Sequence, residues 1–283
     1  MLAVVSSKGS IAAVVFDWAG TIVDFGCFAP TVSIVETFAD RGIQVTLAEA
    51  RGPMGLEKKE HLRRLLDQEG IRRQWRATTG SDPTPSDAQA LYEELEPRLF
   101  QAVKRYSELV PGARELTAEL HASGIGIGSS TGYLRPLMDV VCQEAAAQGL
   151  LMDEVICPSD VPAGRPYPWM CFLNAMRLNA CPMSRVVKIG DTPADMQEGV
   201  NAGAWVIGVT LSGNEVGLSA SEAAEMDPAD REALLRAAET RLLAAGAHYV
   251  TESVATCREV LTRIDERIAR GEQPSAERVH ERV

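Results

Sequence analysis

Asp17 opens the segment DWAGT, directly after a short run of apolar and largely β-branched residues. A carboxylate at such a point can act as a nucleophile or as a metal ligand. Gly20 lets the chain turn sharply, and Thr21 can donate a hydrogen bond back toward the carboxylate of Asp17. Taken alone, an aspartate in this position more often caps the turn or helix that follows it. The chemical interpretation therefore depends on the segments that accompany Asp17.

Three further segments could act with Asp17 on a phosphoryl group. The segment 129–133 (SSTGY) offers hydroxyls and a glycine-linked N–H, which suit phosphoryl oxygens. Arg165 stands between prolines that restrict the backbone, and a fixed guanidinium is a good phosphate clamp. Asp191 and Asp195 lie four residues apart in GDTPAD, and carboxylate oxygens suit Mg²⁺. Singly, these segments could also be a turn, a structural ion pair and a capped helix start.

The surrounding sequence predicts elements that bring these segments together. Short apolar runs typical of buried strands occupy residues 11–16, 125–130, 155–157, 186–189 and 205–209. Segments with helical spacing alternate with them, at residues 113–123, 134–148, 169–178 and 194–202. This alternation predicts an α/β fold with a doubly wound, Rossmann-like parallel sheet. In such sheets ligands bind beyond the carboxyl ends of the strands, where the four segments fall.

Between Cys27 and Tyr106 the pattern changes, because no convincing strand is present and the apolar positions follow helical periods. Amphipathic helices are predicted over residues 30–41, 56–68 and 86–103, with a loop at 78–85. We therefore expect a helical cap formed by residues 27–105, inserted into a catalytic core formed by residues 1–26 and 106–283.

Composition excludes several classes of function. Of the 283 residues, 46% are hydrophobic and 24% are charged, and the formal net charge is −11. These proportions are ordinary for a soluble globular protein. Broad binding to nucleic acid or to anionic membranes is not expected, because both depend on clustered Lys and Arg. An anionic small-molecule substrate would need a local cationic pocket.

The cysteines and the hydropathy pattern bear on location. Six cysteines are scattered without a CxxC pair, which suits neither a zinc site nor a disulfide scaffold and fits a reducing cytoplasm. No apolar stretch reaches the roughly 18 residues that a membrane span needs. The first ten residues, MLAVVSSKGS, lack a basic start followed by a long apolar run. We therefore expect neither secretion nor membrane insertion.

The four segments, in this order and each at an expected strand end, resemble the signature motifs of the haloacid dehalogenase superfamily. The resemblance covers nearly the whole chain, with the helical insert as the cap. It implies that Asp17 is the nucleophile, and that Thr131 and Arg165 hold the phosphoryl group. It also implies a Mg²⁺ site whose residues are Asp17, the backbone carbonyl of Ala19, Asp191 and, as a nearby support, Asp195.

Ala19 is a departure from that pattern. Phosphatases of the superfamily usually carry a second aspartate two residues after the nucleophile, which protonates the departing alkoxide. An ordinary phosphate ester would lose its general acid here. Either activity has been lost, or the leaving group departs on carbon and needs no such proton.

A narrower resemblance selects between these alternatives. The stretches FDWAGT, DFGCFAP, PMGLEKKEH, STGY and VPAGRPYPWM resemble phosphonoacetaldehyde hydrolases. In that family a cap lysine forms a Schiff base with the substrate aldehyde, and Lys58 matches it. His61, three residues later, matches a histidine that handles protons. The residues that match the lining of that family's site are Cys27, Met54, Gly55, Gly132 and Tyr133. Without the match, Lys58, Lys59 and His61 would be taken for a solvated helix face.

The resemblance implies an enzyme that cleaves the carbon–phosphorus bond of phosphonoacetaldehyde to acetaldehyde and phosphate. The intermediates would be an imine on Lys58 and an aspartyl phosphate on Asp17. It also implies a homodimer formed through the cap. Two alternatives keep the same fold: a phosphatase of the superfamily acting on another small substrate, and a catalytically inactive binding protein, which the alanine at position 19 would favour.

Overall fold

A parallel β-sheet forms the centre of the protein in the computed structural model, which describes residues 10–274 and 281–282. The strand order is β3-β2-β1-β4-β5-β6-β7, and every neighbouring pair is parallel. The strands are β1 (Ala13–Phe16), β2 (Gly126–Ser130), β3 (Glu154–Ile156), β4 (Val186–Gly190), β5 (Trp205–Val209), β6 (Tyr249–Thr251) and the short edge strand β7 (Glu281–Arg282).

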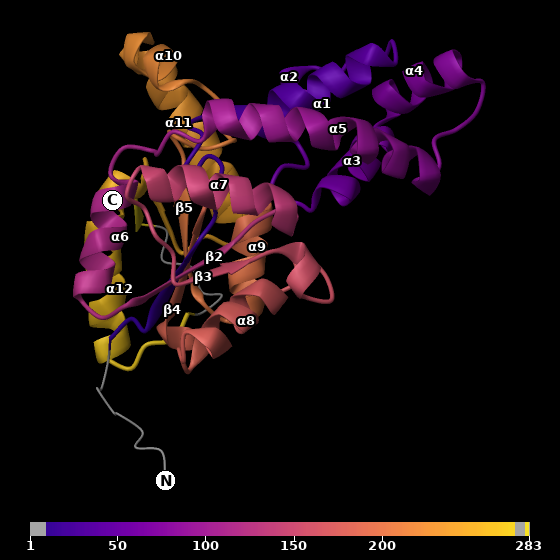
Figure 1. The fold of residues 1–283 in the computed structure, drawn as a ribbon. Coiled ribbons are helices and arrows are strands. Elements are labelled where there is room, and N and C mark those ends of the chain that lie inside the picture. Colours follow the sequence, from indigo (N-terminus) through magenta and orange to yellow (C-terminus); the bar gives the residue numbers. More distant parts are fainter. Residues whose placement is uncertain (1–9, 275–280, 283) are drawn as a thin grey trace.

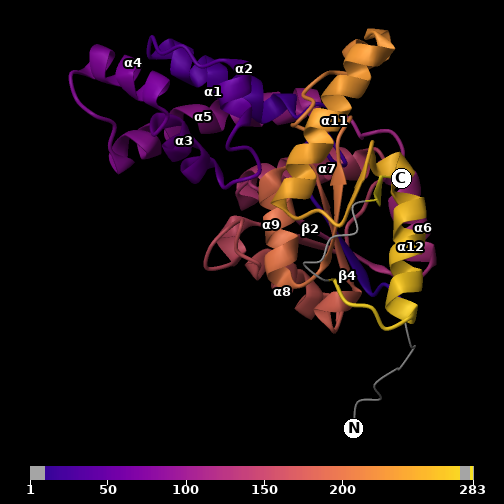
Figure 2. The same cartoon turned by 180° about the vertical axis from the view of Figure 1, so that it is seen from behind.

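Helices cover both faces of the sheet because successive strand residues alternate between two hydrophobic clusters. Val14 and Phe16 belong to the cluster that includes α6 (Ala113–Ala122), α7 (Arg135–Ala147) and α12 (Cys257–Ala269). Ala13 and Val15 pack with α8 (Trp169–Arg177) and α9 (Pro193–Ala202), and α11 (Pro228–Ala245) continues that layer. Figures 1 and 2 show α6 and α12 on one side of the sheet and α8 and α9 on the other.

The strand order creates a topological switch point. From β1 the chain goes to β2 and β3 on one side, and then returns to β4 and continues outward on the other side. The carboxyl ends of β1 and β4 therefore lie next to each other with their connections leading apart, which opens a crevice for ligands. Asp17 directly follows β1, and Asp191 directly follows β4.

Five helices inserted between β1 and β2 form a second layer, here called the cap helices. They are α1 (Phe28–Asp40), α2 (Leu47–Arg51), α3 (Lys58–Leu66), α4 (Glu69–Thr79) and α5 (Pro85–Tyr106). In Figure 1 they run from indigo to magenta and extend away from one end of the sheet. Their apolar faces meet one another, and this cluster is continuous with the face of the sheet that carries α7. A hydrophobic contact thus joins the cap helices to the core.

The remaining elements are α10 (Ala220–Glu225) and three short 3₁₀ helices, η1 (Pro158–Asp160), η2 (Met183–Arg185) and η3 (Val254–Thr256). The predicted fold class, a doubly wound parallel sheet with an inserted helical cap, is confirmed. In the part of the chain that the structure describes, no helix combines the length and the apolar character that crossing a membrane requires. The prediction drawn from the first residues of the chain concerns positions 1–9, which lie outside the described residues. All six cysteines carry free thiols.

Candidate active site

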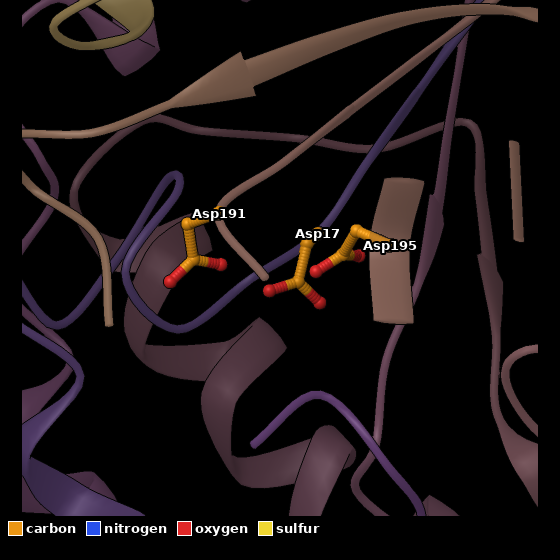
Figure 3. A group of neighbouring side chains, drawn as sticks. All are labelled: Asp17, Asp191 and Asp195. Carbon is orange, nitrogen blue, oxygen red and sulfur yellow. The ribbon is translucent and has the colours of Figure 1, made fainter. Parts of the chain in front are cut away.

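Three buried carboxylates meet at the switch point: Asp17, Asp191 and Asp195 (Figure 3). Each offers one oxygen, and these oxygens all lie within 4.8 Å of one another. Local sequence explains the position of Asp195. Thr192 caps the N-terminus of α9, where its hydroxyl accepts from the backbone N–H of Asp195 and donates to the Asp195 carboxylate. The capping box thus turns Asp195 toward the strand ends.

The turn after Asp17 packs directly against Asp191. Gly20 has φ +86°, and a Cβ built on it would lie 2.3 Å from Asp191 Oδ2, so only glycine fits. The hydroxyl of Thr21 donates to Asp191 Oδ1 at 3.2 Å. The prediction that Thr21 bonds back toward Asp17 is therefore wrong, because the turn carries its side chain over to the neighbouring strand end. The backbone N–H of Asn214 donates to Asp191 Oδ2 at 2.7 Å.

Arg165 is fully enclosed among acidic groups. It forms ion pairs of 2.7 Å with Asp17, 3.0 Å with Asp195 and 3.0 Å with Glu198. It also donates to the backbone carbonyl of Ser130 at 2.7 Å. Burial alone would lower the pKa of Arg165, but the three carboxylates hold it well above its ordinary value. The guanidinium is fixed in position beside the carboxylate of Asp17, as a phosphate clamp would have to be.

Lys188 and Glu198 complete this network and were not predicted from the sequence. The Nζ of Lys188 lies 2.8 Å from Asp195 Oδ1 and 3.6 Å from Glu198 Oε2, and it donates to the hydroxyl of Ser130 at 3.1 Å. Burial and Arg165 would lower the pKa of Lys188, but the carboxylates of Asp195, Glu198 and Asp17 raise it above its ordinary value. A signal was available, because Lys188 interrupts an otherwise apolar strand and Glu198 lies one helical turn after Asp195.

The charges of this cluster fit a divalent cation. Four carboxylates (Asp17, Asp191, Asp195, Glu198) face two cations (Arg165, Lys188), so four negative charges and two positive charges leave a formal −2. Burial, Asp17 and Asp195 together raise the pKa of Asp191 well above its ordinary value, which marks an uncompensated negative environment. A hard ion with oxygen ligands, such as Mg²⁺, suits this donor set.

A small cavity lies between the carboxylates and the cap helices. It measures about 20 Å³, enough for roughly one water molecule. Ten of the predicted site residues line it: Asp17, Ala19, Cys27, Met54, Gly55, Lys58, Thr131, Gly132, Tyr133 and Arg165. Pro30 and Thr192, which were not predicted, complete the lining. Asp191, Asp195 and His61 do not reach the cavity wall. The structure therefore brings residues from the core and the cap helices into one closed site.

Glycines allow the cap helices to approach the core this closely. A Cβ on Gly55, which precedes α3, would lie 2.2 Å from the hydroxyl oxygen of Thr192. A Cβ on Gly132 would lie 2.5 Å from the backbone carbonyl oxygen of Leu56. Both distances are far below van der Waals contact, so a side chain at either position would separate the two layers.

Lys58 brings a buried amine into the cavity from the start of α3. Its side chain is 3% exposed, and its Nζ lies 3.8 Å from the sulfur of Met54 and 5.2 Å from the ring centroid of Tyr133. No carboxylate among the described residues forms an ion pair with it. Burial lowers the pKa of Lys58 below its ordinary value. Lys59 is exposed, and its Nζ lies over the ring of Tyr92 within the cap helices.

His61 lies behind Lys58 on α3 and is completely buried. Its Nε2 lies 2.8 Å from the carbonyl oxygen of Ala50, and since a carbonyl only accepts, Nε2 carries the proton. Its Nδ1 has no hydrogen-bond partner among the described residues. Burial, and then the charge of Lys58, hold the pKa of His61 well below its ordinary value. The ring is thus a neutral imidazole with one free lone pair.

Comparison with known proteins agrees with this geometry. Residues 11–203 match the sequence pattern of the haloacid dehalogenase-like hydrolases. A phosphonoacetaldehyde hydrolase from Nitratidesulfovibrio vulgaris is 48% identical over 266 residues, which are 94% of this chain and 95% of the relative. A phosphonoacetaldehyde hydrolase from Bacillus anthracis is 48% identical over 255 residues, 90% of this chain and 97% of the relative.

Solved structures show the same likeness. A phosphonoacetaldehyde hydrolase-like protein from Oleispira antarctica superposes with a TM-score of 0.93 at 39% identity, covering 97% of this chain and 99% of the other. A β-phosphoglucomutase from Clostridium difficile, at 16% identity and a TM-score of 0.64, shares the fold alone over 90% of this chain and 97% of the other.

Proposed function

Because this chain belongs to the haloacid dehalogenase-like hydrolases and, within them, to the phosphonoacetaldehyde hydrolase family, we propose that it hydrolyses phosphonoacetaldehyde to acetaldehyde and inorganic phosphate. The observation that carries the proposal is the juxtaposition in one cavity of a buried, unpaired amine on Lys58 and the carboxylate of Asp17. A phosphatase needs only the carboxylate, whereas cleavage of a carbon–phosphorus bond needs both groups.

The amine is needed because the carbon left behind by phosphoryl transfer would otherwise be a strongly basic carbanion. Lys58 attacks the substrate aldehyde, and loss of water gives an iminium. Burial lowers the pKa of Lys58 and so favours the neutral amine, which is the form that attacks a carbonyl. His61 does not line the cavity, but its Nδ1 has no hydrogen-bond partner among the described residues, and we propose that it takes up and returns protons as the imine forms and breaks.

Asp17 then attacks phosphorus. The electron pair of the carbon–phosphorus bond moves into the iminium and gives an enamine on Lys58, while the phosphoryl group is carried by Asp17 as an acyl phosphate. Arg165, bonded to Asp17 Oδ1, holds the nucleophile in place and faces the transferring oxygens. Protonation of the enamine carbon and addition of water release acetaldehyde and free Lys58. A second water hydrolyses the acyl phosphate.

Asp17, Asp191 and the backbone carbonyl of Ala19 would hold Mg²⁺, with Asp195 supporting them. The bound ion would supply positive charge for the oxygens of the transferring phosphoryl group. The side chain of Ala19 contributes no acid, in keeping with a leaving group that departs as an enamine. Thr131, whose hydroxyl oxygen accepts from the backbone N–H of Tyr133, supplies its own O–H to a phosphoryl oxygen.

Two measurements test the proposal. The first compares Mg²⁺-dependent phosphate release from phosphonoacetaldehyde with release from an aryl phosphate, and we expect turnover of the phosphonate alone. Preference for the aryl phosphate would make the chain a phosphatase, and no release from either would make it an inactive relative.

The second measurement traps the imine. Borohydride added with phosphonoacetaldehyde or acetaldehyde should inactivate the enzyme and leave an alkylated Lys58 in the peptide map. Lys58→Arg should lose both trapping and turnover, since a guanidinium cannot form an imine. Lys59→Arg is the matched control and should keep both, because Lys59 lies outside the cavity. Label on Lys59, or full activity of Lys58→Arg, would contradict the Schiff-base assignment.

We also propose that residues 27–105 open and close as a cap over the core formed by residues 1–26 and 106–283, since a 20 Å³ cavity cannot admit the substrate. A homodimer formed through the cap helices remains a prediction from family resemblance, and a cytoplasmic location remains a prediction from the scattered cysteines. Light scattering of the purified protein tests the dimer.

A further inference from the structure

Arg51, the last residue of α2, reaches from the cap helices across to the core. Its Nη1 donates to the carbonyl oxygen of Gly26 at 2.7 Å and to Asn214 Oδ1 at 3.3 Å, and its Nη2 donates to the carbonyl oxygen of Gly217 at 3.1 Å. Its guanidinium carbon also lies 5.3 Å from the ring centroid of Phe28. Three acceptors from two separate core segments therefore converge on one side chain.

Asn214, on the core side, also donates a hydrogen bond to Arg51. Its side-chain Nδ2 donates to the backbone carbonyl oxygen of Arg51 at 3.1 Å, so the two residues are joined in both directions. Asn214 is 2% exposed. Its backbone N–H is the one that donates to Asp191 Oδ2 at 2.7 Å. The segment that receives the cap helices is thus the segment that orients a carboxylate of the proposed metal site.

The core segment is shaped for this guanidinium. Gly217 has φ +68°, and a Cβ on it would lie 2.7 Å from the guanidinium carbon of Arg51. The same segment is tied to the start of the cap insertion, because the backbone N–H of Gly26 donates to the carbonyl oxygen of Ser212 at 2.7 Å. Opening of the cap about the chain near Gly26 would have to break the contacts of Arg51 with Asn214 and Gly217.

We infer that Arg51 and Asn214 form a latch that holds the cap closed. Both are positioning residues, since neither lines the cavity. The latch stabilises the closed state only. Loss of the latch lowers the closed population of the free enzyme, and part of the free energy of substrate binding is then used to close the cap.

The kinetic test rests on the proposed function. Arg51→Ala should raise KM for phosphonoacetaldehyde about tenfold while kcat stays within about threefold, because saturating substrate restores closure. Asn214→Ala leaves the bonds of Arg51 to Gly26 and Gly217 in place, so it should raise KM by less. The free-energy effect of the double variant should be smaller than the sum of the two single effects, because the two side chains share the bond that joins them. Arg51→Lys, which keeps the charge and part of the bonding, should lie between. A lower kcat at unchanged KM, or additive effects, would overturn the latch.

The matched control is Arg41→Ala. Arg41 also forms an ion pair and lies over an aromatic ring, with Glu94 and Trp75, but these partners belong to the cap helices. Its loss should leave KM unchanged. An increase in KM equal to that of Arg51→Ala would mean that any weakening of the cap helices has this effect, and would overturn the assignment to Arg51.

Hydrogen exchange provides a readout that does not depend on the substrate. In the protein without substrate, Arg51→Ala should speed exchange in the peptides that cover residues 210–218 and Gly26. In the wild type the backbone N–H of Asn214 donates to Asp191 and that of Gly26 donates to Ser212. Arg41→Ala should not speed exchange in these peptides. If the wild type releases no phosphate from phosphonoacetaldehyde, the proposed function fails while this measurement still tests the latch. Unchanged exchange in Arg51→Ala would refute it.

Discussion

Gly55→Ala should weaken closure of the cap while lowering the stability of the fold no more than an alanine at another glycine with positive φ does. Gly55 has φ +87°, which costs an alanine about 1 kcal/mol. The new Cβ would also meet Thr192 Oγ1 at 2.2 Å. Thr192 cannot move aside without breaking its cap on α9, which costs about 1–2 kcal/mol more. Because Gly55 and Thr192 belong to the two layers that would separate on the proposed opening of the cap, an open cap would relieve the clash at the lowest cost in free energy.

Only the clash opposes cap closure, and its cost of about 1–2 kcal/mol corresponds to a loss of roughly 5-fold to 30-fold in kcat/KM for phosphonoacetaldehyde. Gly80→Ala is the control, because Gly80 has φ +83° and nothing lies within 4 Å of its added Cβ. It bears the same backbone cost without the clash, so it should keep kcat/KM. The melting temperatures of the two variants should be similar. A kcat/KM for Gly55→Ala within threefold of wild type would refute the reasoning.

Three further predictions concern Asp17, Ala19 and Asp24. Asp17→Asn should lower phosphate release at least about a thousandfold through loss of the nucleophile while the melting temperature shows a folded protein; near-normal turnover would exclude Asp17 from that role. Ala19→Asp should lower phosphonate turnover at least about tenfold, because it adds a fifth carboxylate beside four buried ones, and faster turnover would contradict the account of Ala19. Burial raises the pKa of Asp24 from 3.8 to about 7, although the two backbone N–H groups that donate to it at the start of α1 act to lower the pKa. Between pH 3.8 and pH 7, Asp24 is therefore more protonated in the folded state than in the unfolded state. The contribution of Asp24 to the free energy of unfolding is fully present below pH 4 and is lost as the pH rises through 7. The melting temperature of wild type relative to Asp24→Asn should accordingly fall between pH 5 and pH 8, and a constant difference would show that Asp24 does not titrate there.

The sequence predicted the parts of the fold that repeat a simple pattern. All five expected strands are present, and Trp205–Val209 has the predicted bounds, because buried parallel strands are short apolar runs between turns. Three cap helices were expected and are present as α1, α3 and α5. Their bounds differ by a few residues, where caps rather than periodicity decide the ends. At the start of α1, for example, the carboxylate of Asp24 accepts the first N–H groups.

Some of the elements that were not predicted have weak patterns, whereas α11 and α12 lie in a part of the chain for which no helix was predicted. α2 spans only Leu47–Arg51, too short for a helical period to emerge. α4 (Glu69–Thr79) buries only Ile71 and Trp75, so its sequence is largely polar. β6 has three residues and is stabilised by its neighbours in the sheet. Such segments take their structure from tertiary packing, which a single sequence does not reveal.

The site residues also divide into those that the sequence predicted and those that it did not. Residues carried by motifs were predicted because the motifs end strands, and strand ends in a parallel sheet converge. The partners were not predicted, since they come from positions that are distant in sequence. Asn214 meets Asp191 from a loop after β5, and Arg51 meets Asn214 across 163 positions. The sequence around Arg51 and the sequence around Asn214 contain no pattern that predicts these contacts.

Two buried lysines illustrate why partners matter more than residue type. Lys58 and Lys188 are both almost completely enclosed, and burial favours the neutral amine in each. Lys188 has Asp195 and Glu198 within ion-pair distance, and the pKa of Lys188 is raised, so it remains a cation that balances charge. Lys58 has a thioether and an aromatic ring instead, and its pKa is lowered. The same side chain thus has a raised pKa at position 188 and a lowered pKa at position 58, and only the three-dimensional arrangement of carboxylates distinguishes the two lysines.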